Sequence, residues 1–236
     1  RLLQHYYQFL VPPGLRVLEL GCGHGDLLAC LKPDFGIGID FSGKMIRVAS
    51  KKHPNFVFIQ ADSHEIEFRE KFDVIILSDL VNDLWDVQRV FEKLRNLSHS
   101  GTRLILNFFN NLWRIHHVVV NWLGLGAEVL EQNWFSPHDV NNLLKLSGFE
   151  VIQKRPMVLL PLKIPFISKL FNMCLVHFAP FSWFALTNIV IARPDPARDK
   201  LNLRETPSVS VIIPARNEAG NIENIMRRIP ELGFKT

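Results

Sequence analysis

The chain has 236 residues, which is enough for one large domain or for one domain and part of a second. Its 47% hydrophobic and 21% charged residues exclude a disordered chain, and its net charge of +4 includes no dense lysine and arginine block, so nucleic acid is not an expected partner. The three cysteines, Cys22, Cys30 and Cys174, have neither zinc-site nor disulfide spacing, so no metal is expected and a reduced, cytoplasmic setting is favoured.

The first half of the chain alternates short apolar strands with amphipathic helices. Residues 72–77 contain a Val-Ile-Ile-Leu run that is typical of a strand buried on both faces. The same kind of pattern predicts strands at residues 16–20, 37–40, 56–61, 72–77 and 103–108, and helices at residues 26–32, 42–52 and 87–97. Alternating strands and helices imply right-handed βαβ units and therefore a parallel sheet.

The second half begins with a helix whose two ends are marked. Ser136 can cap it, Pro137 suits its first position, and Gly148 can end it in the left-handed conformation. Two further strands are expected at residues 149–155 and 186–193, with no obvious crossover between them.

One segment has to be weighed as a membrane span. Residues 170–192 contain no Asp, Glu, Lys or Arg and are long enough to cross a bilayer. Polar residues such as Asn172, His177 and Asn188 interrupt the segment, so we expect a helix or loop that covers the sheet rather than a span. The alternative is a membrane-surface element, because residues 162–184 mix lysine with Ile, Phe and Trp.

The most informative pattern joins two neighbouring strand ends. Residues 17–25 read Val-Leu-Glu-Leu-Gly-Cys-Gly-His-Gly, and residues 36–40 read Gly-Ile-Gly-Ile-Asp. Glycines let a ligand lie against the turn backbone, and an acid at the next strand end can accept hydrogen bonds from a ribose diol. The dinucleotide fingerprint requires glycine where this chain has Asp26, whose charge would also repel a pyrophosphate, so NAD is disfavoured. The two strand ends therefore predict a nucleoside cofactor at the carboxyl edge of the sheet.

The pattern Glu-x-Gly-x-Gly-x-Gly, followed by the acid at Asp40, resembles motif I of the class I S-adenosylmethionine-dependent methyltransferases. The resemblance covers residues 10–193 and implies an α/β, Rossmann-like sheet of seven strands, the last of them antiparallel. It also implies S-adenosylmethionine as the cofactor, a molecule without a phosphate.

The resemblance further implies a role for each residue at the strand ends. Gly21 and Gly23 would border the amino-acid part of the cofactor, and Glu19 its amino group. Asp40 would hold both ribose hydroxyls, and Asp62 would meet the adenine amino group. The alternative for Glu19 is a capped structural acid, and the alternative for Asp62 is a helix cap. Phe41 and Met45 would flank the adenine, and Gly25 would allow close packing of strand and helix. For Cys22 the alternative is the role of a small buried residue. The implied cofactor-binding set is Glu19, Gly21, Cys22, Gly23, Gly25, Asp40, Phe41, Met45, Ala61, Asp62, Ser63, Ser78 and Leu80.

The residues that handle the methyl acceptor are harder to assign. Methyl transfer from a sulfonium is an in-line displacement, so the protein mainly aligns the reactants and needs a base only where the acceptor must lose a proton. Residues 107–135 are rich in aromatic and imidazole groups and, by resemblance, would cover the acceptor pocket. His116 and His117 are candidate bases there, with a surface or packing role as the alternative, and Asn82 is a candidate acceptor contact.

The C-terminal part of the chain changes character. Residues 194–207 are polar and contain proline, as linkers do. Residues 208–236, a predicted strand, a Pro-x-x-Asn-Glu turn and a helix, resemble the opening of family 2 glycosyltransferases of the GT-A fold. The resemblance implies sugar-nucleotide contacts from Pro214, Ala215 and Glu218, in a domain whose metal-binding and catalytic elements would lie beyond Thr236. Because the chain also begins without methionine, we expect a fragment of a longer protein.

The expected organisation is a methyltransferase domain at residues 1–193, a linker at residues 194–207 and the start of a glycosyltransferase at residues 208–236. The favoured function is a bifunctional enzyme of glycan or glycolipid metabolism, acting on a small molecule or a lipid-linked glycan. It would be cytoplasmic, with peripheral attachment to the inner face of the membrane as an option. The alternatives are a small-molecule or quinone-type methyltransferase, and a non-catalytic module that regulates a fused glycosyltransferase.

Overall fold

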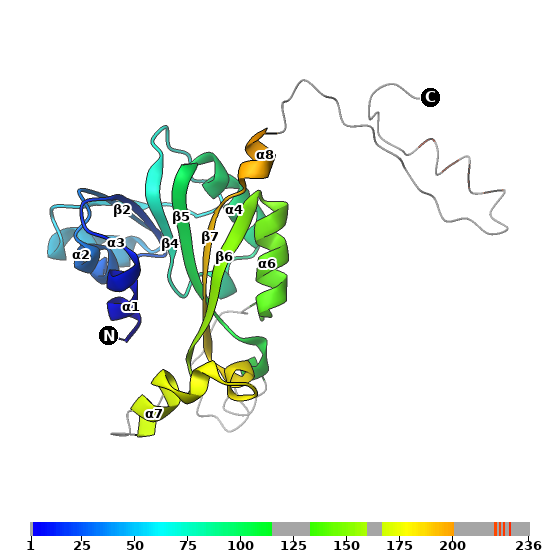
Figure 1. The fold of residues 1–236 in the computed structure, drawn as a ribbon. Coiled ribbons are helices and arrows are strands. Elements are labelled where there is room, and N and C mark those ends of the chain that lie inside the picture. The colour runs from blue at the N-terminus through cyan, green and yellow to red at the C-terminus, as the bar shows by residue number, and fades with distance from the viewer. Residues whose placement is uncertain are drawn as a thin grey trace. The chain divides into compact units, whose positions relative to one another are not determined.

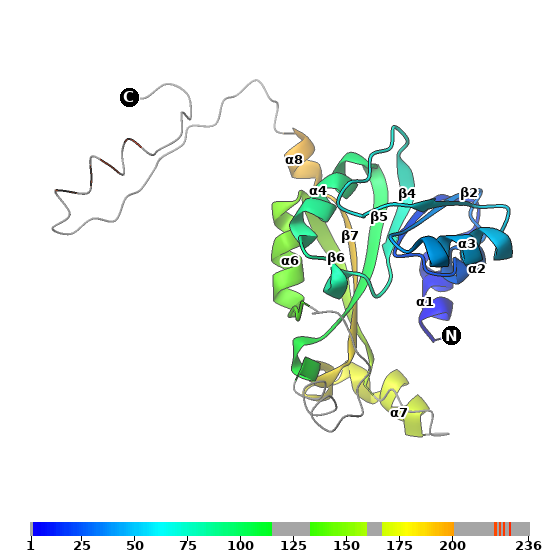
Figure 2. The same ribbon diagram turned by 180° about the vertical axis from the view of Figure 1, so that it is seen from behind.

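The computed structural model describes residues 2–114, 133–159 and 167–200, together with residues 220, 222, 224 and 227. The chain divides into two units, Arg1–Arg198 and Asp199–Thr236, and the first contains the sheet. Figures 1 and 2 show this sheet from opposite sides. Its longer elements are α1 Leu2–Leu10, β1 Arg16–Leu20, α2 Asp26–Leu31, β2 Phe35–Asp40, α3 Gly43–Lys52, β3 Val57–Gln60, β4 Phe72–Leu77, α4 Val87–Asn96, β5 Ser98–Phe109, α6 Pro137–Leu146, β6 Phe149–Val158, α7 Ile167–Met173, β7 Thr187–Pro194 and α8 Pro196–Lys200.

Seven strands form one sheet in the order β3-β2-β1-β4-β5-β7-β6. The strands from β3 to β5 pair in parallel, whereas β7 runs antiparallel to both β5 and β6. The structure therefore confirms the predicted Rossmann-like sheet with its last strand antiparallel.

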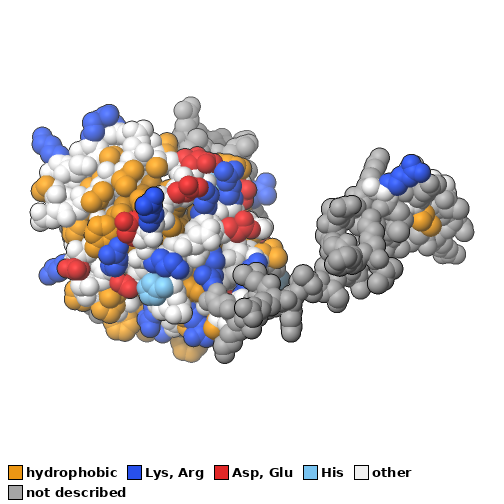
Figure 3. All heavy atoms as spheres, turned by 90° about the horizontal axis from the view of Figure 1, so that it is seen from above, with side chains coloured by type: hydrophobic (Ala, Val, Ile, Leu, Met, Phe, Trp, Pro, Cys, Tyr) orange, Lys and Arg blue, Asp and Glu red, His pale blue; other side chains and the backbone are white. Residues whose placement is uncertain are grey.

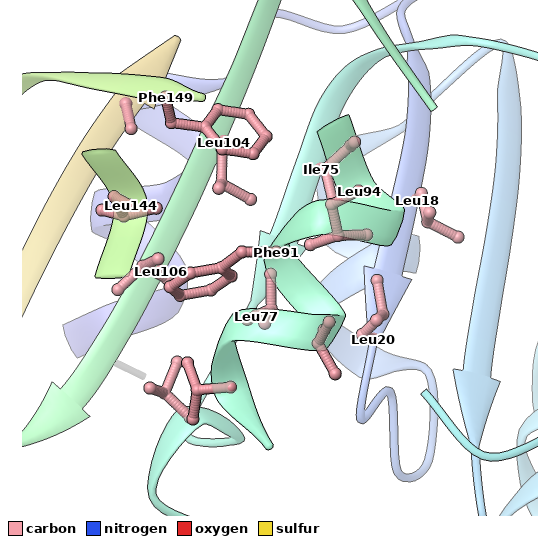
Figure 4. Packing of buried hydrophobic residues seen from close by; sticks show 14 of the residues in the cluster. Leu18, Leu20, Ile75, Leu77, Phe91, Leu94, Leu104, Leu106, Leu144 and Phe149 are labelled. Carbon is pink, nitrogen blue, oxygen red and sulfur yellow. The ribbon is translucent and has the colours of Figure 1, made fainter. Parts of the chain in front are cut away.

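Each face of the sheet has its own apolar cluster, because successive strand residues point to opposite faces. Leu18 and Leu20 of β1 join the cluster formed with α4 and α6, in which Phe91 and Leu144 are fully buried. Figure 4 shows strand side chains from this cluster meeting Phe91 of α4. Val17 belongs instead to the cluster formed with α1 and α2. The sheet is thus buried on both faces, as the apolar run in β4 predicts.

The helix ends follow the local sequence. Ser136 Oγ accepts a hydrogen bond from Asp139 N, and Asp139 in return accepts one from Ser136 N, which is a capping box with Pro137 in the first turn. Gly148 has φ 82°, the left-handed value expected where this helix ends. The predicted limits of α6 are therefore confirmed.

Three elements differ from the expectation. α1 is absent from the predicted elements, although Leu3, Tyr7 and Leu10 recur at helical spacing and contact the second cluster. β5 begins at Ser98 rather than at residue 103. α8 lies within residues 194–207, where a linker is expected, and Arg198 Nη1 donates to Leu146 O (2.8 Å), which ties α8 to the first unit.

The uncharged segment contains short elements before the last strand. α7 is followed by two 3-10 helices, η3 Leu175–His177 and η4 Phe181–Phe184, and then by β7. No helix in the described part of the chain combines the length and the apolar composition that a membrane span requires. On the face seen in Figure 3, basic, acidic and hydrophobic side chains are interspersed, so that face has no single-sign charge field.

Candidate cofactor site

The parallel register aligns the ends of four neighbouring strands. Leu20 of β1 pairs with Ile39 of β2 and with Leu77 of β4, and Asp40 of β2 pairs with Gln60 of β3. The residues that follow these ends therefore lie along one edge of the sheet. They are the glycine turn Gly21, Gly23 and Gly25, the group Phe41, Ala61, Asp62 and Ser63, and the pair Ser78 and Leu80.

The glycine turn has two packed positions and one open position. All three glycines have positive φ, 69° at Gly21, 51° at Gly23 and 73° at Gly25, a conformation that other residues rarely adopt. A Cβ at Gly25 would lie 2.5 Å from the Phe58 ring, and one at Gly21 would lie 3.1 Å from Leu80. A Cβ at Gly23 would meet nothing within 4 Å. Packing thus leaves no room for a side chain at Gly25 and little at Gly21, whereas the backbone at Gly23 is open to a ligand.

Asp40 fastens this turn to the end of β2. Its Oδ2 accepts a hydrogen bond from Gly23 N and its Oδ1 accepts one from Ser42 N, each at 2.9 Å. Each carboxylate oxygen has a second lone pair, so both can still accept from a ligand's hydroxyls. The neighbouring Phe41 side chain is 73% exposed, which leaves an apolar surface available beside the acid.

Glu19 is buried beneath the turn, with only 2% of its surface exposed. Its Oε2 accepts from Leu28 N (3.0 Å) in the first turn of α2, where the N-cap Gly25 has no side chain to do so. Burial raises the pKa of Glu19 to about 8, and the nearby charges of Asp26 and Asp40 act in the same direction. A cationic ligand group beside this carboxyl would favour its ionised form.

Two other residues of the turn have structural partners. Cys22 is buried, and burial raises its pKa to about 12, so its thiol is a packing group rather than a nucleophile. The Asp26 carboxylate contacts Lys52 Nζ (2.6 Å) and His53 Nε2 (2.9 Å), and these hydrogen bonds lower its pKa. Because the Asp26 charge is compensated at the end of α3, the charge argument against a pyrophosphate is weaker than expected. The missing third glycine still departs from the dinucleotide fingerprint.

Asp62 follows β3 and is held on one side only. Its Oδ1 accepts from His64 N (2.9 Å) and lies 2.6 Å from His64 Nδ1, and these bonds lower the pKa of Asp62. The side chain is 55% exposed, and among the described residues nothing bonds to Oδ2. The carboxylate is therefore ionised, oriented and accessible. Nearby, Ser63 is buried, whereas Met45 and Ala61 are partly exposed.

A hydrogen-bond network that begins at the buried residues Tyr7 and Asn107 supports the end of β4, where Ser78 and Leu80 are partly exposed. Tyr7 OH of α1 donates to Asn107 Oδ1 (2.7 Å), and Asn107 Nδ2 donates to Asp79 Oδ1. Burial raises the pKa of Tyr7, so it remains a neutral donor. Asp79 has φ 55°, an unusual value for a residue with a side chain, and the network holds it there.

The structure shows backbone partners for one acceptor candidate, Asn82. Asn82 has no exposed surface; its Nδ2 donates to Asn133 O (2.7 Å) and Phe109 O (3.4 Å), and its Oδ1 accepts from Phe109 N (2.8 Å). Since the whole amide is buried and engaged with backbone, Asn82 joins two segments and has a structural role. The other candidates, His116, His117, Pro214, Ala215 and Glu218, lie outside the described residues.

Metal ligands were not expected, and the described ranges contain no group of three or more His, Cys, Asp or Glu side chains arranged to hold an ion.

Two residues that support the site, Tyr7 and His64, are not among those predicted from the sequence. The helical spacing of Leu3, Tyr7 and Leu10 would have revealed α1 and hence Tyr7. No pattern distinguishes His64 from a surface histidine, because two of its partners, Trp85 and the α4 cap Asp86, are distant in sequence.

Comparisons with known proteins agree with this geometry. Residues 1–154 match the model of a family described as a methyltransferase domain. A demethylmenaquinone methyltransferase from Thermotoga maritima is 32% identical over 164 residues, which is 58% of this chain and 70% of that protein.

Two solved structures share the fold. One, an S-adenosylmethionine-dependent methyltransferase from Mesorhizobium loti, has a TM-score of 0.63 and 18% identity over 80% of this chain and 96% of that one. The other, magnesium protoporphyrin IX methyltransferase from Synechocystis with bound SAH, has a TM-score of 0.55 and 21% identity over 78% of this chain and 75% of that one.

Proposed function

The chain belongs to the methyltransferase domain family and uses S-adenosylmethionine, and from this premise we propose that it methylates an amphipathic acceptor at a membrane surface. The observation that carries the cofactor part of the proposal is the single edge formed by the glycine turn, Asp40 and Asp62. An enzyme of this family is favoured over a non-catalytic regulatory module.

We assign the cofactor contacts by the chemistry of this edge. Asp40 offers two acceptor oxygens for the ribose hydroxyls, and the accessible Oδ2 of Asp62 is an acceptor for the adenine amino group. The open backbone at Gly23 borders the amino-acid part, and the buried Glu19 carboxyl lies beneath it as the partner for the amino group.

The cofactor supplies an activated methyl group whose departure leaves a neutral thioether. The residues of the chain therefore have to hold the cofactor and the acceptor in line rather than stabilise a large developing charge. Hydrogen bonds from Gly23 N and Ser42 N hold Asp40, and the bond to Leu28 N holds Glu19, so the polar groups of the site are oriented before a ligand arrives.

An exposed aromatic surface supports a membrane-bound acceptor. It consists of Phe178, Trp183 and Phe184, which are 64%, 65% and 56% exposed. Asn110, directly after β5, fixes the backbone beneath it, since Asn110 Nδ2 donates to Trp183 O (3.0 Å). In Figure 1 the η4 region lies at the end of the sheet where β5 finishes, the same end as the cofactor edge.

The charge around this aromatic surface favours an anionic bilayer as its partner. Residues 151–192 contain no Asp or Glu but include four Lys or Arg residues, and the Lys154 and Arg155 side chains are exposed. Exposed Trp and Phe beside basic residues bind the headgroup region of membranes, where anionic lipids attract the basic groups.

Co-sedimentation with vesicles tests this surface. We expect the protein to bind phosphatidylglycerol vesicles more tightly than phosphatidylcholine vesicles, and the double variant Trp183→Ser, Phe184→Ser to lose most of this binding while retaining SAH affinity. Leu146→Ser is the matched control, because Leu146 is 60% exposed at the other end of the sheet, on α6. Equal binding by the double variant would refute a role for this surface in membrane attachment.

For the acceptor, we propose a lipid-linked glycan or glycolipid, with a quinone as the alternative. The first rests on the resemblance of residues 208–236 to a glycosyltransferase opening, which would make the protein bifunctional, with a proposed methyltransferase domain at residues 1–193 and a proposed linker at residues 194–207. The second rests on the demethylmenaquinone methyltransferase relative. Incubation with methyl-labelled cofactor and a fractionated lipid extract separates them, since label would appear in the glycolipid or in the quinone fraction.

A further inference from the structure

His64 is a buried histidine two residues after Asp62. Its side chain is covered by Trp85, whose ring stacks on the imidazole with 4.4 Å between the centroids, and the residue is only 3% exposed. A buried imidazole needs partners for both ring nitrogens, and both partners are present.

These two partners determine the tautomer of His64. Nε2 lies 3.3 Å from Asp86 N, a group that can only donate, so Nε2 is the acceptor and carries no proton. Nδ1 therefore carries the proton and donates it to Asp62 Oδ1 at 2.6 Å. His64 thus presents a fixed donor to one oxygen of the Asp62 carboxylate.

The imidazole is also held from the start of α4, independently of Asp62. Asp86 is the N-cap of α4, where its Oδ1 accepts from Arg89 N (2.9 Å). Arg89 Nη2 in turn contacts Glu65 Oε1 at 2.5 Å, which ties the start of α4 to the segment after β3. Because the ring is fixed from this side, the orientation of the exposed Asp62 carboxylate follows that of His64.

We propose that His64 is a positioning residue that aims Asp62 Oδ2 at the adenine amino group and thereby makes the site prefer adenine to a 6-oxopurine. The proposal rests on the proposed function in one respect, the assignment of Asp62 to the adenine. His64 N and Nδ1 occupy Oδ1, so the ligand meets Oδ2. A 6-oxopurine presents a carbonyl there, and two acceptors facing each other repel.

The test compares two ligands rather than one affinity. Calorimetry gives the ratio of the Kd for S-inosylhomocysteine, the 6-oxo analogue, to the Kd for SAH. His64→Phe keeps a ring beneath Trp85 but lacks the donor, and we expect it to reduce this ratio about tenfold, as loss of one oriented hydrogen bond to a charged group does. His64→Asn keeps an N–H near the position of Nδ1 and should retain most of the preference.

The control is a second histidine–aspartate pair. His99 Nε2 lies 3.1 Å from Asp73 Oδ1, and His99→Phe should leave the ratio unchanged. A wild-type ratio in His64→Phe overturns the proposal, as does an equal loss in His64→Phe and His64→Asn, which would indicate packing alone. If His64→Phe does not fold, His64→Leu provides the same readout.

The variant Asp62→Ala distinguishes a failure of the role proposed for His64 from a failure of the proposed cofactor binding. An unchanged ratio in that variant would show that Asp62 does not face the adenine, which overturns the role of His64 but leaves cofactor binding intact. Failure of the wild-type chain to bind SAH at all would instead contradict the proposed function.

Discussion

Replacement of Glu19 by glutamine should change the stability of the protein and its cofactor affinity in opposite directions. The carboxyl is 2% exposed, and burial raises its pKa from 4.5 to about 8. An acid with a raised pKa binds its proton more tightly in the folded state, so stability falls as pH rises between these two values. At ~1.4 kcal/mol for each pKa unit, the ionised group destabilises the unliganded fold by up to about 5 kcal/mol above pH 8.

Glu19→Gln removes this penalty and keeps an oxygen that can accept from Leu28 N. Denaturant unfolding of the unliganded protein should therefore give equal stability for variant and wild type near pH 4.5, and a more stable variant at pH 8 and above. Glu150→Gln, at an exposed acid paired with Arg193, should show no such divergence.

Binding should respond in the opposite sense. The cofactor's amino group favours the ionised form of Glu19, so binding near pH 7 should release a proton from the wild type, which calorimetry in two buffers of different ionisation enthalpy detects. The variant should release none and bind about tenfold more weakly or worse, because it lacks a charge-assisted bond. Parallel pH–stability curves for variant and wild type would refute the burial argument.

Three substitutions and one truncation test the site further. Gly25→Ala should destabilise the fold, because its Cβ would lie 2.5 Å from Phe58. Gly23→Ala should fold with a modest loss of stability from its positive φ, and it should lose SAH affinity. Equal decreases in the melting temperature of the two variants would contradict this distinction. Tyr7→Phe should lower the free energy of unfolding by about 1 kcal/mol, since it removes the shorter of two hydrogen bonds to Asn107 Oδ1 and leaves only the one from Asp79 N (3.3 Å); urea titration measures this. A chain truncated after Lys200 should bind SAH like the full chain, and loss of binding would show that residues 201–236 belong to the cofactor site.

Most of the sheet was predictable because its strands are short and apolar and alternate with amphipathic helices. The glycine turn and Asp40 were predictable for a related reason: they follow strand ends that a parallel sheet brings to one edge. α1 was missed because it precedes the first recognisable strand, and α8 because Pro196 and Asp195, read as linker residues, also suit a helix start.

Strand and helix patterns could not predict contacts between segments that are distant in sequence. Asn82 was a candidate contact for the acceptor because it follows a strand end, and burial and three backbone contacts give it a structural role. The same limit applies to His64, whose function depends on the cap of α4. Sequence spacing locates a residue along the chain, whereas the direction of its side chain depends on packing.

The central claim is that the edge formed by the glycine turn and Asp40 binds S-adenosylmethionine. Calorimetry with SAH, comparing the wild type with Asp40→Ala, tests it most directly, with Asp34→Ala as a control because Asp34 is exposed at the opposite end of β2. We expect the wild type to bind SAH and not NAD, and Asp40→Ala to bind about ten- to a hundredfold more weakly, because it loses hydrogen bonds to a charged acceptor. Wild-type affinity in Asp40→Ala, or binding of NAD in place of SAH, would contradict the account.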